Sequence, residues 1–239
     1  LERSLAEVRI KNPYTRAQWR EIIDTLIAQQ PFEDQGVYFQ VTRGVAKRDH
    51  AFPAGVEPTV FLMSNPLVNP SRELVENGGA AVTAVDNRWL RCDIKSISLL
   101  GNCLMRQLSA DCGAAETIMF RDGKLTEASA SNVFIVSKGI IIGPQKSNLI
   151  LPGITYDVVV EIARAQRMPL ELREVTEAEV RSAGEVWITS SSKEVLAIVT
   201  LDGKQVGSGR PGPVFGRMYQ GYQDFKQSVM RQRKQTVAA

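Results

Sequence analysis

The sequence predicts an α+β fold with an antiparallel-rich larger domain. Expected strands outnumber expected helices along the chain. Two Asp-Gly pairs, Asp122-Gly123 and Asp202-Gly203, are typical of tight turns between neighbouring antiparallel strands. A regular alternation of strand and helix, which would indicate a parallel α/β sheet, is not seen. The chain also carries neither a G-x-G-x-x-G fingerprint nor a P-loop.

Helical patterns come first in the chain. The apolar stripe of Leu1, Leu5 and Val8 predicts a helix that is already under way at the first residue, so we expect a further segment before Leu1 in the natural protein. Thr15 is typical of an N-cap, and apolar residues recur at helical spacing over residues 16–30.

Strands follow these helices. The β-rich residues 37–43 predict a buried strand, and residues 59–63 predict a second one. Residues 65–72 contain two prolines and are interpreted as a linker. We therefore expect a small N-terminal domain of residues 1–68 and a large C-terminal domain of residues 69–239.

The larger domain is expected to hold most of the strands. One helix, over residues 98–113, has five apolar residues on one face: Leu99, Leu100, Cys103, Leu104 and Leu108. Two further helices are predicted over residues 155–167 and 215–231. The predicted strands cover residues 80–86, 117–120, 133–136, 140–142, 186–189 and 195–201.

Charge does not favour nucleic acid as a partner. The chain has 29 Lys and Arg residues against 26 Asp and Glu residues, so its formal net charge is 29 − 26 = +3. This excess is too small and too scattered to indicate a nucleic-acid footprint. The densest basic cluster is interpreted as a solvated terminal helix rather than a nucleic-acid arm. It consists of Lys226, Arg231, Arg233 and Lys234.

Membrane and metal roles are not expected either. No apolar run approaches the roughly 18 residues of a membrane span, and residues 1–11 do not resemble a signal peptide. The three cysteines Cys92, Cys103 and Cys112 match no zinc pattern, and the chain has one histidine. We interpret them as reduced thiols of a cytoplasmic protein without a metal.

Lys95 is a candidate nucleophile. It lies between an expected strand and an expected helix, with apolar neighbours on both sides. Desolvation there would favour the neutral amine, the form that makes a Schiff base with an aldehyde. The alternative is a surface lysine whose stem covers apolar residues.

Glu127 is a candidate partner for a ligand. Small residues follow it at 128–131, which would let the backbone approach a planar ligand closely. A carboxylate in such a place could bond a protonated ring nitrogen. A polar turn before a strand is the alternative interpretation.

Two segments could bind phosphate. The sequence LPGIT at residues 151–155 opens a predicted helix, whose first N–H groups favour anions. Thr155 could add a hydroxyl to such a site or could simply cap the helix. Four hydroxyl residues at 189–192 follow a strand and suit a phosphate-lined loop or a polar turn.

Together and in this order, the motifs resemble the fold-type-IV pyridoxal-phosphate (PLP) transaminases, and most closely the bacterial D-amino acid aminotransferases. The resemblance covers essentially the whole chain. It implies a two-domain fold with a small α/β N-terminal domain, incomplete here, and a larger β-barrel-like C-terminal domain. The matching stretches are YFQVTRGVAKRDH, RWLRCDIKSISLLGN, LTEASASNVFIV, NLILPGIT and VWITSSSKEV.

The resemblance also implies roles for single residues. Lys95 would form the Schiff base with PLP, and Glu127 would bond the pyridine nitrogen. Leu151 would pack against the ring. Ile154 and Thr155, together with Ser190 and Ser191, would hold the phosphate, and Gly153 is a further cofactor-binding residue.

Substrate binding and assembly are implied in the same way. Arg48 and His50 match an R-x-H pair that helps to bind the substrate carboxylate from the neighbouring subunit, so a homodimer is implied. The family's first residues, absent before Leu1, normally supply a phosphate-binding arginine and a tyrosine of the carboxylate site. Ala130 stands where a relative typically has serine, and the lost hydroxyl would weaken contacts with the cofactor.

The implied reaction moves the amino group of a D-amino acid such as D-alanine to a 2-oxo acid such as 2-oxoglutarate. A branched-chain aminotransferase, an (R)-amine transaminase, an aminodeoxychorismate lyase and a non-enzymatic PLP-binding protein remain alternatives. Leu100 argues against the first, because branched-chain enzymes have tyrosine there, and the R-x-H pair favours a substrate with a carboxylate. The preferred amino acid and its stereochemistry stay open.

Overall fold

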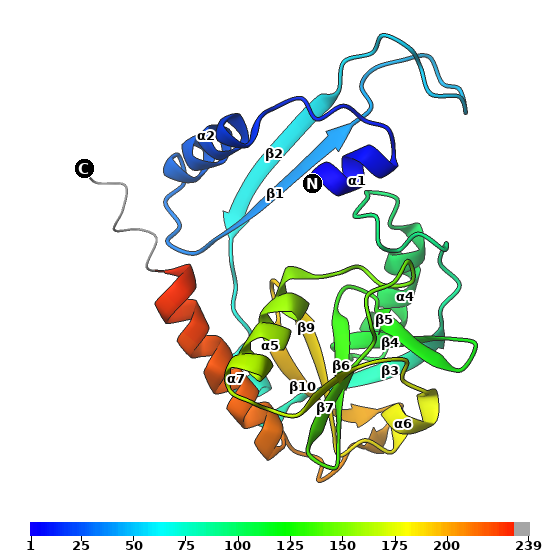
Figure 1. The fold of residues 1–239 in the computed structure, drawn as a ribbon, viewed down its shortest axis with the longest axis vertical. Coiled ribbons are helices and arrows are strands. Elements are labelled where there is room, and N and C mark those ends of the chain that lie inside the picture. Colours follow the sequence, from blue (N-terminus) through cyan, green and yellow to red (C-terminus); the bar gives the residue numbers. More distant parts are fainter. Residues whose placement is uncertain (232–239) are drawn as a thin grey trace. The chain divides into compact units, whose positions relative to one another are not determined.

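The computed structural model describes residues 1–231 and divides the chain into two compact units (Figure 1). The first unit comprises residues 1–68 together with residues 94–98. The second comprises residues 69–93 and the described residues from 99 onward. Both units combine helices with β-structure, and the α+β fold class predicted from the sequence is confirmed.

The first unit is a two-stranded antiparallel sheet with two helices. Thr15 caps the second helix as predicted, in a reciprocal capping box with Gln18. The Trp19 ring lies 5.6 Å from the Phe39 ring, between their centroids, and thus fixes this helix to the sheet. The elements are α1 (Glu2–Glu7), α2 (Arg16–Ala28), β1 (Gln35–Thr42) and β2 (Thr59–Pro66).

The prediction that residues 37–43 form a buried strand is wrong in one respect. The strand exists, but every residue of β1 is at least partly exposed. A two-stranded sheet has one face to pack against α2, and its other face stays open. Tyr38, Phe61 and Met63 are exposed there.

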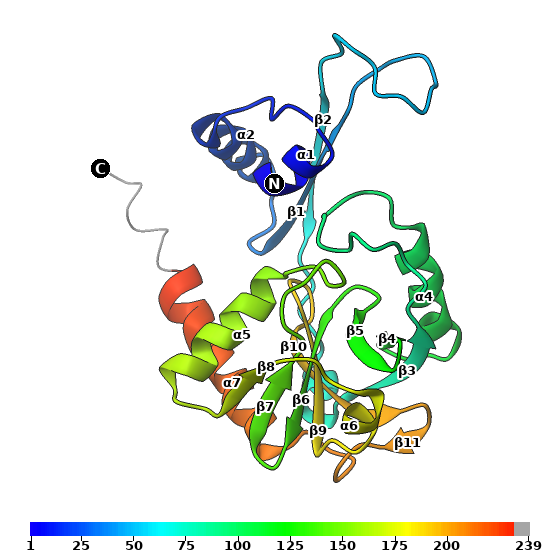
Figure 2. The same cartoon turned by 45° about the vertical axis from the view of Figure 1, so that its right-hand side comes forward.

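The second unit is built on one curled, nine-stranded mixed sheet (Figure 2). The strand order is β5-β4-β3-β10-β9-β6-β7-β8, and β11 pairs with β10. Most neighbouring pairs are antiparallel, whereas β3 runs parallel to both β4 and β10, and β7 to β8. The strands are β3 (Gly79–Val85), β4 (Glu116–Arg121), β5 (Lys124–Ala128), β6 (Asn132–Ser137), β7 (Ile140–Gly143), β8 (Leu170–Leu172), β9 (Glu185–Ser190), β10 (Glu194–Leu201) and β11 (Lys204–Gln205).

Both Asp-Gly turns predicted from the sequence join antiparallel strands. Asp122 and Gly123 link β4 to β5 with φ angles of 51° and 71°, and Asp202 and Gly203 link β10 to β11 with 50° and 73°. Positive φ at both central residues matches the right-handed twist of the strands. A third turn, between β6 and β7, has the same backbone with Lys138 at its first position, a residue type that the Asp-Gly signal misses.

Two apolar cores lie on opposite sides of the sheet. One fills the curl of the sheet with residues such as Ile118, Val133 and Ile188. The other joins the sheet to α5 and α7 through residues such as Tyr156 and Trp187 (Figure 1). The helices of this unit are α3 (Arg72–Asn77), α4 (Leu100–Asp111), α5 (Ile154–Ala165), α6 (Glu177–Arg181) and α7 (Pro213–Phe225), followed by a π-helical turn at Lys226–Met230.

Helix α4 presents most of its apolar face outward. Met105 and Ser109 are its buried residues, and Thr117 of β4 donates a hydrogen bond from Oγ1 to the Met105 carbonyl at 2.6 Å. The side of α4 that carries Leu100 and Leu104 is exposed, at 74% and 56%. A face of this kind on a folded chain indicates an unfilled contact surface.

The C-terminal helix is held at its start by a buried carboxylate. Glu185 of β9 accepts hydrogen bonds from the backbone N–H groups of Val214 and Phe215, at 3.0 and 2.8 Å, and so caps α7. The helix predicted over residues 215–231 is confirmed as α7 with its π-helical extension. Arg233 and Lys234 of the basic cluster lie outside the described residues.

Other features of the described residues bear on function. None of the helices between residues 1 and 231 is both long and apolar enough to span a membrane. Within that range no cluster of His, Cys, Asp and Glu is placed to hold a metal ion. Cys92, Cys103 and Cys112 are all free thiols.

Candidate active site

Glu127 is a buried carboxylate near the end of β5. Only 5% of the residue is exposed. Its Oε1 accepts a hydrogen bond from Arg88 Nη1 at 2.7 Å, and its Oε2 accepts one from the Leu151 backbone N–H at 2.9 Å. Oε1 therefore keeps a lone pair that could accept a proton donor of a ligand.

Burial raises the pKa of Glu127 to about 7, against the opposing effects of Arg88 and the Leu151 N–H. An added cationic N–H donor at Oε1 would favour the ionised form. A protonated ring nitrogen has the required charge and geometry, so Glu127 fits the role that the resemblance implies for it.

Arg88 belongs to a buried ionic cluster that sequence reasoning missed. Its guanidinium donates to both carboxylate oxygens of Asp86 at 2.9 Å, and Arg121 pairs with Asp86 at 3.1 Å. The Thr126 hydroxyl donates to Asp86 at 2.8 Å. The cluster of Asp86, Arg88, Arg121 and Glu127 is electrically neutral when both acids are ionised.

The pKa of Asp86 is held at about 2. Burial acts to raise it, but the hydrogen bonds and charge of Arg88, with help from Thr126, overcome that effect. Asp86 thus stays ionised over the physiological range and orients Arg88 toward Glu127.

Asn132 connects Glu127 to the segment that precedes α5. Its Nδ2 donates to the Leu151 carbonyl at 2.8 Å and lies 3.2 Å from Glu127 Oε2. A Cβ atom on Gly153 would lie 2.4 Å from Asn132 Oδ1, so this close approach requires glycine. The structure therefore brings together three residues singled out in the sequence, Glu127, Leu151 and Gly153.

The N-terminus of α5 has the features of an anion site. Its N-cap is Gly153, which supplies no side-chain cap, so N–H groups of the first turn remain available. Ile154 is exposed there, whereas Thr155, one residue further along the helix, is buried. Gly153 holds the N-cap position, so Thr155 does not cap the helix.

A buried hydroxyl without a partner lies close to this helix start. Thr189 faces Asn132 across the β6–β9 pair, and its Oγ1 has no hydrogen-bond partner among residues 1–231. A buried hydroxyl normally has one. Together with the uncapped first turn of α5, this atom fits a polar ligand such as a phosphate.

Ser190 and Ser191 lie where β9 turns into β10. Ser190 is half-buried and Ser191 is exposed. Ser190 Oγ accepts a hydrogen bond from the Lys193 backbone N–H at 3.1 Å, which leaves the serine proton available to an anion.

Lys95 lies in the first unit, in an irregular segment between β3 and α4, as its neighbours in the sequence predict. Its backbone N–H donates to Ser4 Oγ at 3.1 Å. The expected desolvation is wrong for this chain, because Lys95 is exposed. Short irregular segments rarely cover a side chain by themselves.

Arg48 and His50 lie in the long loop between β1 and β2, and both are exposed. Arg43 anchors the start of this loop. Its guanidinium lies 3.6 Å from the centroid of the Phe52 ring and donates to the Val8 and Arg9 carbonyls at 2.6 and 3.0 Å.

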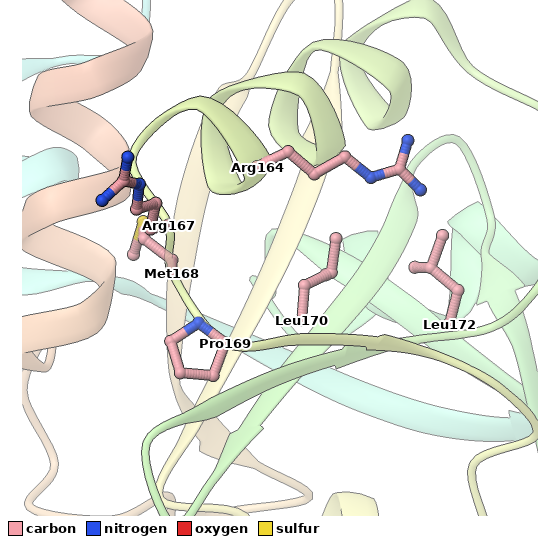
Figure 3. Close-up of a pocket in the computed structure, with 6 residues that line it drawn as sticks. All are labelled: Arg164, Arg167, Met168, Pro169, Leu170 and Leu172. Atoms are coloured by element: carbon pink, nitrogen blue, oxygen red, sulfur yellow. The ribbon is translucent and has the colours of Figure 1, made fainter.

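A surface hollow of about 470 Å³ lies elsewhere in the second unit, at the end of α5 beside β8 (Figure 3). It contains none of the residues discussed above. Its two arginines lie at the C-terminal end of a helix, where cations are favoured without any ligand. The hollow is lined by Arg164, Arg167, Met168, Pro169, Leu170 and Leu172.

Comparison with known proteins identifies the family. The model of the amino-transferase class IV family matches residues 1–201. The chain is 39% identical to a D-alanine aminotransferase of Bacillus licheniformis over 214 residues, covering 90% of this chain and 75% of that protein. It is 36% identical to a D-alanine aminotransferase of Staphylococcus haemolyticus over 227 residues, covering 95% and 80%.

Solved structures share the fold at lower identity. A branched-chain aminotransferase from Thermoproteus uzoniensis with norvaline superposes with a TM-score of 0.84 at 23% identity, over 94% of this chain and 76% of that one. A branched-chain amino acid aminotransferase from Escherichia coli also gives 0.84, at 22% identity, over 92% and 74%. These two similarities concern the fold alone. Because the family model matches residues 1–201 and the relatives are similar over most of the chain, the chain belongs to the class IV amino-transferases.

Proposed function

We propose that this protein transfers the amino group of a D-amino acid, such as D-alanine, to a 2-oxo acid, such as 2-oxoglutarate, with PLP as its cofactor. The main support for this proposal is the environment of Glu127. This buried carboxylate is fixed by Arg88 and Leu151 and keeps one lone pair for a cationic N–H donor. Relatives at 35–39% identity are named D-alanine aminotransferase, which supports the D-amino acid as substrate.

The residues of the second unit suit the two ends of PLP. Glu127 would bond the ring nitrogen, and Leu151, held by Glu127 and Asn132, would pack against the ring. Gly153, Ile154 and Thr155 at the start of α5, with Ser190 and Ser191, would bind the phosphate. When bound, PLP supplies an electron-withdrawing ring that stabilises negative charge on the carbon that loses a proton.

Lys95 would provide the amine for covalent attachment of the cofactor and for proton transfer. Its amine would bind the aldehyde carbon of the cofactor covalently until the substrate amine displaces it. The released amine would then take the α-proton from the substrate and return it. Arg48 and His50 would bind the substrate carboxylate, acting from one subunit on the site of the next.

A spectrum tests the proposal directly. The purified protein is mixed with PLP, and its visible absorption is recorded before and after D-alanine or L-alanine is added. We expect a visible band that D-alanine alone abolishes and that 2-oxoglutarate restores. Absence of any protein-dependent band would overturn the assignment of the cofactor, and a band that both alanines leave unchanged would overturn the assignment of the reaction.

Replacing Arg48 with alanine should lower kcat/KM for D-alanine by about 10- to 100-fold, the loss expected for hydrogen bonds to a charged group. Turnover of isopropylamine, which has no carboxylate, should change little. Steady-state kinetics with both amines measure the difference, and Arg20→Ala, at an exposed ion pair with Asp24, is the matched control. Unchanged D-alanine turnover would show that Arg48 does not bind the carboxylate.

A homodimer is proposed because the carboxylate site implied by the family needs a neighbouring subunit. The outward apolar face of α4 supports it, since a second copy would cover Leu100, Leu104 and Leu108. A cytoplasmic location is proposed on the basis of the three free thiols Cys92, Cys103 and Cys112.

Replacing Leu104 with glutamate should weaken this dimer by about 30-fold in Kd, the effect of losing one apolar anchor of an interface. Light scattering after size-exclusion chromatography over a dilution series measures the change. Val229→Glu, at another exposed apolar position, provides the control. An unaltered dimer would mean that α4 is not part of the interface.

The branched-chain aminotransferase remains a second candidate, because solved branched-chain enzymes share the fold. Turnover of L-leucine in preference to D-alanine would favour it. An (R)-amine transaminase, an aminodeoxychorismate lyase and a non-enzymatic PLP-binding protein have no observation of their own in their favour.

A further inference from the structure

Glu116, at the start of β4, is a buried carboxylate without a role in the site described above. The residue is fully buried. Five donors surround it, and all of them belong to the second unit. They are the hydroxyls of Ser129 and Ser131, the backbone N–H groups of Thr117 and Ala130, and the ammonium group of Lys193.

Four of these donors come from two turns beside residues of the candidate site, and the fifth, the Thr117 N–H, belongs to β4 itself. The turn at residues 129–131 directly follows β5, which carries Glu127. The turn at residues 190–193 joins β9 to β10 and carries Ser190 and Ser191. Glu116 is thus the common acceptor that holds one turn against the other.

Lys193 is the cation of this arrangement. Its Nζ lies 3.4 Å from Glu116 Oε1, and its side chain is 24% exposed while that of Glu116 is fully buried. An uncompensated carboxylate in such a place would be strongly unfavourable, and it would also repel an anionic ligand bound nearby. Lys193 removes both effects because it neutralises the charge.

The same residue fixes the hydroxyl of Ser190. The Lys193 backbone N–H donates to Ser190 Oγ at 3.1 Å, so the serine proton points away from this bond and is available as a donor. One lysine therefore anchors the turn through its ammonium group and orients the hydroxyl of Ser190 through its amide.

We propose that the Glu116–Lys193 ion pair, called the latch below, holds the Ser190–Lys193 turn in the conformation that binds the phosphate group of the cofactor. This proposal rests on the proposed function, because it concerns how the same site binds its cofactor. Lys193 and Glu116 are positioning residues here, because they act through the turn and not on the cofactor itself.

Pyridoxal, which lacks the phosphate but has the same ring and aldehyde, separates this role from a general structural one. Lys193→Met keeps the side-chain stem and removes the charge. We expect it to weaken PLP binding roughly tenfold, as for one lost charge-assisted hydrogen bond, and to leave pyridoxal binding unchanged. Lys193→Arg should restore PLP affinity. Absorbance titrations with PLP and with pyridoxal measure both affinities.

A second readout uses the protein without cofactor. Hydrogen exchange at the amides of residues 190–193 should be faster in Lys193→Met than in the wild type, because the turn has lost its anchor. Lys124→Met, which removes the exposed ion pair between Lys124 and Glu174, is the matched control and should change neither affinity nor exchange.

Each outcome decides the matter. A variant Lys193→Met that binds PLP as the wild type does, or that loses PLP and pyridoxal affinity to the same extent, overturns the latch while the proposed function stands. A wild-type protein that binds neither compound overturns the proposed function, and the latch with it. The test replaces Lys193 rather than Glu116 because the Lys193 side chain is 24% exposed, whereas that of Glu116 is fully buried.

Discussion

Replacing Lys95 with alanine is expected to lower kcat/KM for amino transfer by roughly 10⁴-fold, the full contribution of a well-placed acid–base group. The protein should nevertheless stay folded. Lys95 is exposed, and none of the hydrogen bonds or ion pairs found among residues 1–231 uses its side chain. The free energy of unfolding should therefore change by less than about 0.5 kcal/mol.

Lys95→Ala should thus lower the activity of the protein and leave its stability nearly unchanged. Urea denaturation of the wild type and the variant measures the first, and steady-state turnover of D-alanine measures the second. Methylamine in the buffer should restore part of the activity of Lys95→Ala, because a small amine can accept the α-proton in place of the missing side chain. Lys95→Arg keeps a positive charge but has no neutral amine at working pH, so it should remain inactive. An active Lys95→Arg variant would contradict a role in proton transfer.

Much of the fold could be predicted because the signals are local. Thr15 caps its helix through an atom three residues away, and the Asp122-Gly123 turn depends on two adjacent residues. The apolar stripe of α4 was also visible in the sequence. Its exposure was not, because a stripe shows only that a face is apolar and not whether the same chain covers it.

The candidate site was predictable only in part, for the same reason. Glu127 and the start of α5 are recognised from short motifs. The partners that set the properties of Glu127 lie far away in sequence: Arg88 is 39 residues before it, and Leu151 is 24 residues after it. An arginine two residues after an aspartate has no distinctive signal of its own. Only the folded sheet, which sets β3 beside β4 and β4 beside β5, brings these side chains together.

Removal of the Arg88 side chain is expected to cause a large decrease in the free energy of unfolding. Its side chain is 3% exposed and serves two buried acids, Asp86 and Glu127. Arg88→Met would fill similar space but leave Glu127 without its cation, and breaking a buried pair in this way typically costs about 3–5 kcal/mol. Urea denaturation measures the loss. Arg72→Met, at an exposed pair with Glu76, should cost less than about 1 kcal/mol.

The cost of losing Arg88 should depend on pH. The pKa of Glu127 is raised to about 7 from an ordinary value of 4.5, so folding favours the protonated acid. That contribution to stability is fully present below about pH 4.5 and is lost as pH rises through 7. Near pH 5 Glu127 is neutral, so the positive charge of Arg88 stabilises it little. Near pH 8 Glu127 is ionised, and its burial then depends on that charge. The destabilisation by Arg88→Met should therefore be larger at pH 8 than at pH 5.

Asp86 does not produce this trend. Its pKa is about 2, below the ordinary 3.8, so its contribution to stability is lost only as pH falls through that low value, and it stays ionised at both pH values. Arg121 also remains paired with it after Arg88 is gone. The double variant Arg88→Met/Glu127→Gln isolates the cause, because an amide at position 127 cannot ionise. Its stability relative to Glu127→Gln should not vary between pH 5 and pH 8. If the single and double variants followed the same pH curve, the charge on Glu127 would not be what Arg88 balances.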